Sequence, residues 1–329
     1  MTENPSLLVD ALSDLIRAFR LSGSMFFRVR LRAPYAVTAA GVEEIATEYV
    51  PQANPHHLIP FHLVTRGPLW MDIEGAEPVR LSDGDIIVLP RGATHSLMDK
   101  PGRPSVPVAD LRDHISGNPS TLDWGGRGEA VEALCGFFQY ESRFFNPLLQ
   151  ALPEVLVIPH DSARSSWLMA TLERTFTETQ DRRAGRTAMI DRLTELLFLE
   201  ILQRHLDDGG AGGWLSALTD PVAGAALTHL HAEPEQDWTL DSLARASNTS
   251  RSTLAQRFTE RVGISPMRYL TEWRMELAAQ RLEETDDSIA QIAVGAGYDS
   301  EAAFNRAFKR HTGEPPAAWR RRRAALALA

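Results

Sequence analysis

An internal repeat near the C-terminus constrains the fold of this chain more than any other feature of its sequence. The positions Leu254, Phe258, Gly263 and Pro266 return 50 residues later as Phe304, Phe308, Gly313 and Pro316. Upstream of them, Leu240, Leu243 and Ala244 return 49 residues later as Ile289, Ile292 and Ala293. Because the apolar residues of each copy are spaced as on one face of a helix, the repeat predicts two copies of one helical unit.

Each copy reads as two helices joined by a short turn. A short amphipathic segment leads into a turn at 247–249 in the first copy and at 295–299 in the second. A serine follows each turn, Ser250 or Ser300, and its hydroxyl can accept a hydrogen bond from the backbone of the next helix. The pattern predicts helix-turn-helix units at about 240–262 and 288–311, in which the second helix is the candidate recognition helix.

The second helix of each unit exposes polar side chains that can read DNA. The apolar pairs of the repeat, such as Leu254 and Phe258, are expected to face the core. On the outward face, arginine suits guanine, glutamine or asparagine suits adenine, and serine suits either a base or a phosphate. The candidate DNA contacts, with the capping serines included, are Ser250, Arg251, Ser252, Gln256 and Arg257 in the first unit and Ser300, Glu301, Ala302, Asn305, Arg306 and Lys309 in the second.

One helix is predicted to join the two units. Pro266 is typical of a helix start, and the apolar residues after it continue at helical spacing to about Glu284. Such a helix would be roughly 28 Å long, close to the ~34 Å turn of B-DNA. One chain could therefore place two recognition helices in successive major grooves. A helical bundle without DNA-binding activity is the alternative, but nothing in it would require this repeat and linker.

The charge distribution permits DNA binding without indicating it. Residues 237–329 contain 14 Lys+Arg and 12 Asp+Glu, for a net charge of +2. The whole chain contains 34 and 43, so the remainder contains 20 and 31, for a net charge of −11. Any surface that binds a polyanion is therefore expected at the C-terminus.

The second unit contains a dense run of family-specific residues, namely Ile292-Ala293, Gly297-Tyr298-Asp299-Ser300, Ala303-Phe304, Arg306-Ala307-Phe308-Lys309, Gly313 and Pro316. With them, the region 238–323 resembles the DNA-binding domain of AraC/XylS-type transcription regulators. The resemblance implies a double-stranded DNA operator and makes RNA polymerase a candidate partner, with activator or repressor left open. It implies base-reading positions at Ser252, Gln256, Glu301, Ala302, Asn305 and Arg306.

The N-terminal part of the chain reads as short strands. Ile45, Thr47 and Tyr49, which are typical of strands, occupy alternate positions, and further strands are predicted at 61–64, 69–73, 79–81, 86–89 and 133–140. Residues 103–128 are rich in Pro, Gly, Asp and Ser and predict a long loop. After residue 161 the apolar residues change to helical spacing.

Within the strand-rich segment, Gly84, Pro90, Gly92 and His95 have the spacing of the second cupin motif, with Asp99 in place of its asparagine. The segment therefore resembles a cupin, a small β-barrel into which the motif histidine points. The predicted fold class is α+β. Its expected parts are a cupin-like β-barrel sensor domain at 1–160, a helical connector at 161–220, and an all-α double helix-turn-helix domain at 221–329.

Three histidines are expected to form an effector pocket inside the barrel. Measured against the first cupin motif, Pro60 replaces the glutamate and His56 keeps one histidine position. His62 follows Pro60 by two residues and therefore faces the same way along a strand. His56, His62 and His95 could bind an unknown small molecule or, as three imidazoles, a transition metal. Since the carboxylate is missing, no metal or other cofactor is predicted, and hydrogen bonding within the core is the alternative for each histidine.

Two other function classes follow from these domains. A cupin dioxygenase or isomerase with an attached DNA-binding domain is the alternative function, and it would need a complete metal triad. An alkyl-repair enzyme would need several cysteines, whereas Cys135 is the only one. That thiol is either a redox sensor or an inert buried group. The predicted activity is therefore transcription regulation without catalysis.

Location and assembly are the last expectations from sequence. No secretory signal or membrane span is apparent, so the cytoplasm is the expected compartment. The helix predicted at 189–204 has an apolar stripe of Ile190, Leu193, Leu197 and Ile201. Something must cover that stripe. A second copy of the chain would make a homodimer, and packing within the chain is the alternative.

Overall fold

The computed structural model describes residues 8–19, 21–44, 57–116, 121–140, 145–160, 167, 170–171, 174, 184–209 and 212–326. They form two compact units. One unit contains the strands and helix α5 (Arg186–Asp207), and the other contains α1 (Leu8–Phe19), α3 (Pro147–Ala151) and the helices after α5. The expected boundaries at 160 and 220 do not coincide with this division, because α1 and α3 pack on C-terminal helices while α5 packs on the sheet.

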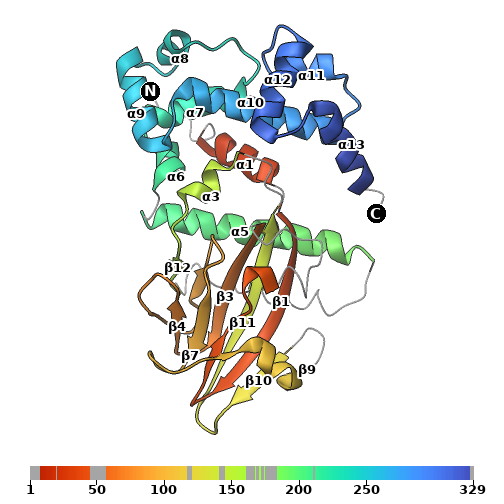
Figure 1. The fold of residues 1–329 in the computed structure, drawn as a ribbon. Helices are drawn as coiled ribbons and strands as arrows, with labels where there is room; N and C mark the ends of the chain where they lie inside the picture. The colour runs from red at the N-terminus through yellow and green to blue at the C-terminus, as the bar shows by residue number, and fades with distance from the viewer. Residues whose placement is uncertain are drawn as a thin grey trace. The chain divides into compact units, whose positions relative to one another are not determined.

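The strand-rich unit is built from two mixed sheets (Figure 1). The first has seven strands in the order β12-β6-β3-β11-β1-β10-β9, and the second has five in the order β5-β4-β7-β2-β8. The first sheet comprises β1 (Leu21–Arg32), β3 (Leu58–Arg66), β6 (Ile86–Val88), β9 (Ile115–Ser116), β10 (Thr121–Gly125), β11 (Ala130–Tyr140) and β12 (Leu156–Ile158). The second comprises β2 (Ala36–Thr38), β4 (Leu69–Ile73), β5 (Val79–Leu81), β7 (His95–Met98) and β8 (Val106–Pro107), and the 3-10 helix η2 spans Val108–His114.

The central strands β3 and β11 contribute to two cores, because successive side chains of a strand point to opposite faces. On one face, Phe61 stacks on Phe138, which contacts Phe198 of α5. On the other face, His62 lies opposite Cys135 in the ladder, and Cys135 belongs to the apolar core between the two sheets. The pleat therefore brings His62 into the interior of the cupin-like unit.

Helix α5 uses its apolar stripe within the chain. Ile190, Leu197 and Ile201 are buried, and α5 packs against β1 and β12. Met189 and Leu196 remain 45% exposed on the same helix. Packing within the chain, the alternative to dimerisation in the sequence analysis, thus covers most of the apolar stripe.

The helical unit places both predicted helix-turn-helix units around one long helix. Its helices after α5 are α6 (Gly213–Leu218), α7 (Ala223–Ala232), α8 (Leu240–Ala246), α9 (Arg251–Val262), α10 (Pro266–Glu284), α11 (Ile289–Gly295), α12 (Glu301–Thr312) and α13 (Pro316–Leu326). The N-terminal half of α10 packs with the first unit, where the ring of Tyr269 meets that of Phe258. Its C-terminal half supplies Met275 and Leu282 to the second core, with Phe308. The helix is therefore part of both units.

The N-terminal helix α1 belongs to this unit through a buried polar contact as well as through packing. The Asp14 carboxylate lies 3.3 Å from Nδ1 of His231, and His231 Nε2 lies 2.8 Å from the Tyr269 hydroxyl. The same hydroxyl accepts a hydrogen bond from the Trp214 indole at 3.0 Å. The sequence analysis placed α1 in the sensor domain because the helix lies near the strands along the chain. A contact with residues more than 200 positions away leaves no local sequence pattern.

The α+β fold class is confirmed, with strands in the N-terminal part and helices in the C-terminal part. The long loop predicted at 103–128 is wrong, since this region contains β8, η2, β9 and β10. Strand β10 pairs in parallel with β1. The strand is only five residues long and lies among turn-forming residues, so the sequence pattern did not indicate it. The strand expected at 45–49 lies outside the described residues, as does most of the helical pattern at 167–176.

Candidate nucleic-acid interface and interior histidine pair

Capping bonds define the start of each helix in the first helix-turn-helix unit. The Thr239 hydroxyl accepts a hydrogen bond from Ser242 N, and the Ser242 hydroxyl accepts one from Thr239 N, which together form a capping box before α8. Asn248 adopts a positive φ of 51° in the turn, a conformation that asparagine tolerates. The predicted cap of α9 is confirmed, because the Ser250 hydroxyl accepts a bond of 3.1 Å from Thr253 N.

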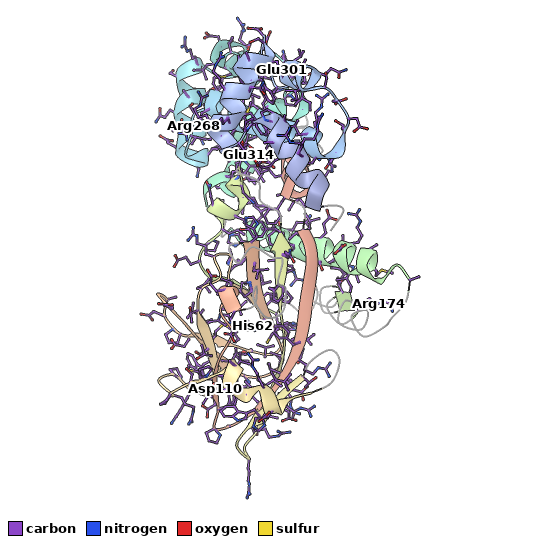
Figure 2. The ribbon with its side chains drawn as sticks, turned by 45° about the vertical axis from the view of Figure 1, so that its right-hand side comes forward. His62, Asp110, Arg174, Arg268, Glu301 and Glu314 are labelled. Carbon is purple, nitrogen blue, oxygen red and sulfur yellow. The ribbon has the colours of Figure 1, made fainter. Side chains whose placement is uncertain are left out.

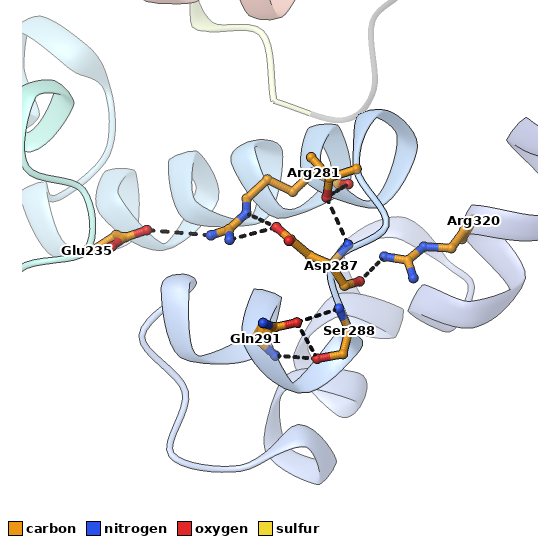
Figure 3. Close-up of polar contacts among 7 residues, drawn as sticks. Glu235, Arg281, Asp287, Ser288, Gln291 and Arg320 are labelled. Atoms are coloured by element: carbon orange, nitrogen blue, oxygen red, sulfur yellow. Dashed lines mark hydrogen bonds and ion pairs between the residues drawn. The ribbon is translucent and has the colours of Figure 1, made fainter.

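The second unit repeats this construction. The Ser288 hydroxyl and the Gln291 side chain form the capping box of α11, which Figure 3 shows. Gly297 provides the turn with a φ of 78°, where a side chain would be strained. Ser300 then caps α12 by accepting a hydrogen bond of 3.2 Å from Ala303 N, as predicted.

The candidate contacts on α9 fall into two groups. Arg251, Ser252 and Gln256 are exposed, and their bonds lie at the surface. Arg251 pairs with Asp241 at 3.5 Å, and Gln256 donates to Glu260 at 2.8 Å. Exposed ion pairs contribute little to stability, so these side chains can exchange such partners for DNA at small cost.

Arg257 differs, because it is held against the protein by Asp220. Its guanidinium donates to the Asp220 carboxylate at 2.6 Å, and Arg261 lies 3.4 Å from the same group. The other Asp220 oxygen accepts from the backbone N–H groups of Val222 and Ala223, each at 3.0 Å, at the start of α7. Arg257 therefore links the recognition helix to the helices beneath it.

The electrostatics of Asp220 show how firmly this contact is made. Burial alone would raise the pKa of its carboxyl, but the hydrogen bonds from Arg257 and from the Ala223 and Val222 amides outweigh that effect. The pKa falls to about 2. Asp220 is thus a buried anion that anchors α9, and sequence patterns missed it because it lies between predicted helices.

The candidate contacts on α12 are more open. Glu301, Ala302, Arg306 and Lys309 are exposed, whereas Asn305 is half-buried. Figure 2 shows Glu301 on the helical unit. In the part of the chain that the structure describes, no ion pair engages Arg306 or Lys309. Their charges are free to meet a phosphate or a base edge.

The interior of the strand-rich unit brings two of the three candidate histidines together. His62 of β3 and His95 of β7 come from different sheets, and their Nε2 atoms are 2.7 Å apart. Both side chains are buried. Figure 2 shows His62 among the strands. His56 lies outside the described residues.

Hydrogen bonding fixes the tautomers of this pair. His95 Nδ1 lies 2.9 Å from the carbonyl oxygen of Ala93, which can only accept, so Nδ1 carries the proton. Neutral His95 then has a bare Nε2, to which His62 Nε2–H donates. His62 Nδ1 is consequently a bare acceptor, and it is buried without a partner.

The surroundings keep both rings neutral. Burial lowers the pKa of His62 well below 6.5, and the neighbouring His95 lowers it further. Burial also lowers the pKa of His95, and the bond to Ala93 opposes this only in part. Among the described residues, no group of three His, Cys, Asp or Glu side chains could hold a metal ion. Burial raises the pKa of the Cys135 thiol, which favours the inert form over a redox sensor.

Comparison with known proteins agrees with both units. The cupin family model matches residues 10–207, and the helix-turn-helix domain model matches residues 243–322. A putative AraC-like transcription regulator of Streptomyces lividans is 34% identical over 271 residues, which cover 80% of this chain and 87% of the relative. The chain belongs to the AraC-like transcription regulators.

Other relatives extend the family match. The HTH-type transcriptional regulator AlkR of Acinetobacter baylyi is 28% identical over 95% of this AraC-like chain and 99% of its own length. Among solved structures, the DNA-binding domain of the global transcriptional factor AdpA in complex with a target DNA is 32% identical. The match covers 32% of this chain and 96% of the AdpA domain, with a TM-score of 0.30. The matched helix-turn-helix domain and the AraC-like relatives together identify the chain as a DNA-binding transcription regulator.

No helix of this AraC-like regulator that the structure describes is long and apolar enough to cross a membrane.

Proposed function

We propose that this regulator reads a specific operator with α9 and α12. The observation that supports this best is the second recognition helix, whose charged residues Glu301, Arg306 and Lys309 are exposed while Phe304 and Phe308 fill the core beneath them. Arg306 is the principal base contact, because it is exposed, and arginine bonds guanine in the major groove. Ser252 and Gln256 act likewise on α9. Regulation of transcription, without a catalytic reaction, is the activity that this arrangement serves.

Arg306→Ala tests this proposal. We expect a loss of about 5- to 150-fold in affinity for the selected operator, the range for one good base contact, with non-specific binding largely retained. Arg80→Ala is the control, since Arg80 is an exposed arginine on β5 of the strand-rich unit and its loss removes the same charge. Equal weakening on operator and random DNA would instead make Arg306 a phosphate contact.

We further propose that the strand-rich unit binds a small-molecule effector at the His62–His95 pair. The unpartnered His62 Nδ1 supports this, because a buried acceptor without a hydrogen bond costs about 1–3 kcal/mol. The site therefore favours a neutral ligand that donates a hydrogen bond, such as an alcohol or a phenol. An anion would place a second acceptor against Nδ1.

A panel of small alcohols and phenols, screened for thermal stabilisation of the full chain, tests the effector site. A ligand that stabilises the native chain should lose its effect in His62→Leu and keep it in His114→Ala, where the histidine is exposed on η2. Stabilisation that survives His62→Leu would place the effector elsewhere. Stoichiometric iron or manganese in the purified protein, lost in the His62/His95 double variant, would favour the metalloenzyme alternative.

We also propose that the regulator forms a homodimer through the part of α5 that packing leaves open. Met189 and Leu196 are seven positions apart, so they lie on the same side of the helix, and both are 45% exposed. A monomer by sedimentation at micromolar concentration would contradict the dimer.

A further inference from the structure

Two arginines of the long helix α10 span the junction between the helix-turn-helix units. Arg274 and Arg281 are seven residues apart and therefore lie on the same side of the helix. Each reaches the segment 234–236 before the first unit, and each also lies against a glycine of the second unit. Neither belongs to a recognition helix.

Arg274 binds the backbone on the side of the first unit. Its Nε donates to the carbonyl of Pro234 at 2.7 Å, and its Nη2 donates to that of Gln236 at 2.8 Å. On the side of the second unit, a Cβ on Gly297 would overlap the guanidinium, with 2.8 Å to its Cζ. The absence of a side chain at Gly297 thus leaves room for the Arg274 guanidinium, which binds the segment before the first unit.

Arg281 also joins the segment before the first unit to the second unit, as Figure 3 shows. Its Nη1 lies 3.5 Å from the Glu235 carboxylate, while Nε and Nη2 donate to Asp287 at 3.2 and 2.9 Å. Asp287 immediately precedes the Ser288 cap of α11. A Cβ on Gly295 would come within 2.5 Å of Nη1.

The Asp287 end of this contact is itself fixed. The backbone carbonyl of Asp287 accepts from Arg320 of α13 at 2.6 Å, and Arg320 Nε also donates to the carbonyl of Leu282 at 3.3 Å. The Thr285 hydroxyl accepts from Asp287 N at 3.3 Å. Arg281 therefore connects Glu235 to a part of the second unit that several hydrogen bonds hold in place.

We propose that Arg274 and Arg281 are positioning residues that fix the relative placement of the two recognition helices, and so make this regulator select the spacing between two operator subsites. The proposal rests on operator reading by both units. One extra base pair moves a subsite by about 3.4 Å and turns it by roughly 35° around the duplex. A rigid pair of units cannot follow that movement, whereas a pair hinged in α10 could follow part of it.

The test uses the full chain and a duplex that it selects from a random-sequence library. Binding is then measured on that duplex, on derivatives with one base pair inserted or deleted between the subsites, and on a duplex that keeps only the first subsite. For the native chain we expect each spacing change to reduce affinity by at least about tenfold, as a mismatch does. For Arg281→Ala and Arg274→Ala we expect the loss on respacing to shrink to below about threefold, with first-subsite binding unchanged.

Gly295→Ala separates positioning from stability. It keeps every charge but places a methyl group where Nη1 of Arg281 lies, and the guanidinium is the flexible end of its side chain. Gly295 ends α11 without a positive φ, and alanine favours a helix more than glycine does. We expect thermal stability to be kept while spacing selection weakens. Arg268→Ala is the matched control, because Arg268 lies on α10 and, among the described residues, its ion pair is with Glu272 of the same helix, at 3.6 Å. The substitution does not remove the contact of Glu272 with His311 of α12, which lies 3.1 Å away.

The outcomes distinguish the claims. If the native chain selects no duplex, operator reading fails. If it selects one and penalises respacing, but the Arg274, Arg281 and Gly295 variants penalise it equally, the positioning role is overturned. Equal weakening of these variants on all duplexes, in step with a lower melting temperature, would also overturn it and leave the arginines a structural role only. Loss of spacing selection in Arg268→Ala would show that any charge on α10 has this effect.

Discussion

Asp220→Asn gives a quantitative test of how α9 is anchored. The substitution keeps the shape of the side chain and an oxygen for the Val222 and Ala223 amides, but it removes the charge that faces Arg257 and Arg261. A pKa lowered from 3.8 to about 2 corresponds to about 2.4 kcal/mol at about 1.36 kcal/mol per pH unit. The Arg257 and Arg261 side chains are 43% and 48% exposed, so solvent screening lowers this figure. We expect the variant to be less stable by about 2 kcal/mol at pH 7.

The pH dependence follows from the direction of the shift. The folded pKa is below the unfolded one, so the stabilisation is complete above about pH 5 and is lost as the pH falls toward 2. The difference between native chain and variant should therefore be constant from pH 5 to 8 and shrink to about half of that value near pH 3. Urea unfolding of the full chain, followed by its helical circular-dichroism signal, measures it.

A matched control is available on the neighbouring helix. Asp241 of α8 pairs with Arg251 at 3.5 Å, but both side chains are at least 60% exposed, so Asp241→Asn should leave stability unchanged. An Asp220→Asn variant as stable as this control at pH 7 would refute the reasoning. So would a destabilisation that does not diminish in acid, since it would then arise from packing and not from charge.

Three further predictions concern a helix cap, the cysteine and the buried histidine pair. Ser300→Ala should destabilise the helical unit by about 1 kcal/mol in urea unfolding, because it removes the cap of α12, and an unchanged midpoint would contradict this. Cys135 should resist iodoacetamide at pH 7 in the native chain and react fully in guanidinium, since burial raises its pKa; labelling of the folded chain would oppose the inert assignment. The strand-rich unit should lose stability as the pH falls below about 6.5, because the unfolded chain binds protons that His62 and His95 exclude, and His62→Leu should reduce that slope.

The helical unit was the more predictable part from sequence, because its signals are local. The repeat, the serine caps and the glycine turn of the second unit each involve residues close together along the chain, and Ser250 and Ser300 cap the predicted helices. The spacing of Pro266 and the apolar residues after it likewise predicted α10 with its observed ends. Local signals of this kind survive folding because helices form from contacts within one turn.

Contacts between distant segments could not be predicted in this way. Asp14 meets His231 across most of the chain, and Asp220 holds Arg257 from a turn that carries no motif. The meeting of His62 and His95 was expected from the cupin resemblance, but the bare Nδ1 follows only from the carbonyl of Ala93. Such placements depend on sheet order and on which helix packs where, which one sequence does not encode as a local pattern.

The central claim is that one chain reads two successive major grooves through α9 and α12. Dimethyl sulfate interference on a selected duplex, bound by the full chain, tests it most directly, because the reagent methylates guanine N7 in the major groove and adenine N3 in the minor groove. The structure predicts two patches of major-groove interference on one face of the DNA, about 10 base pairs apart, with the patch assigned to α12 weakened by Arg306→Ala. A single patch unaffected by Arg306→Ala, or interference confined to the minor groove, would contradict the account.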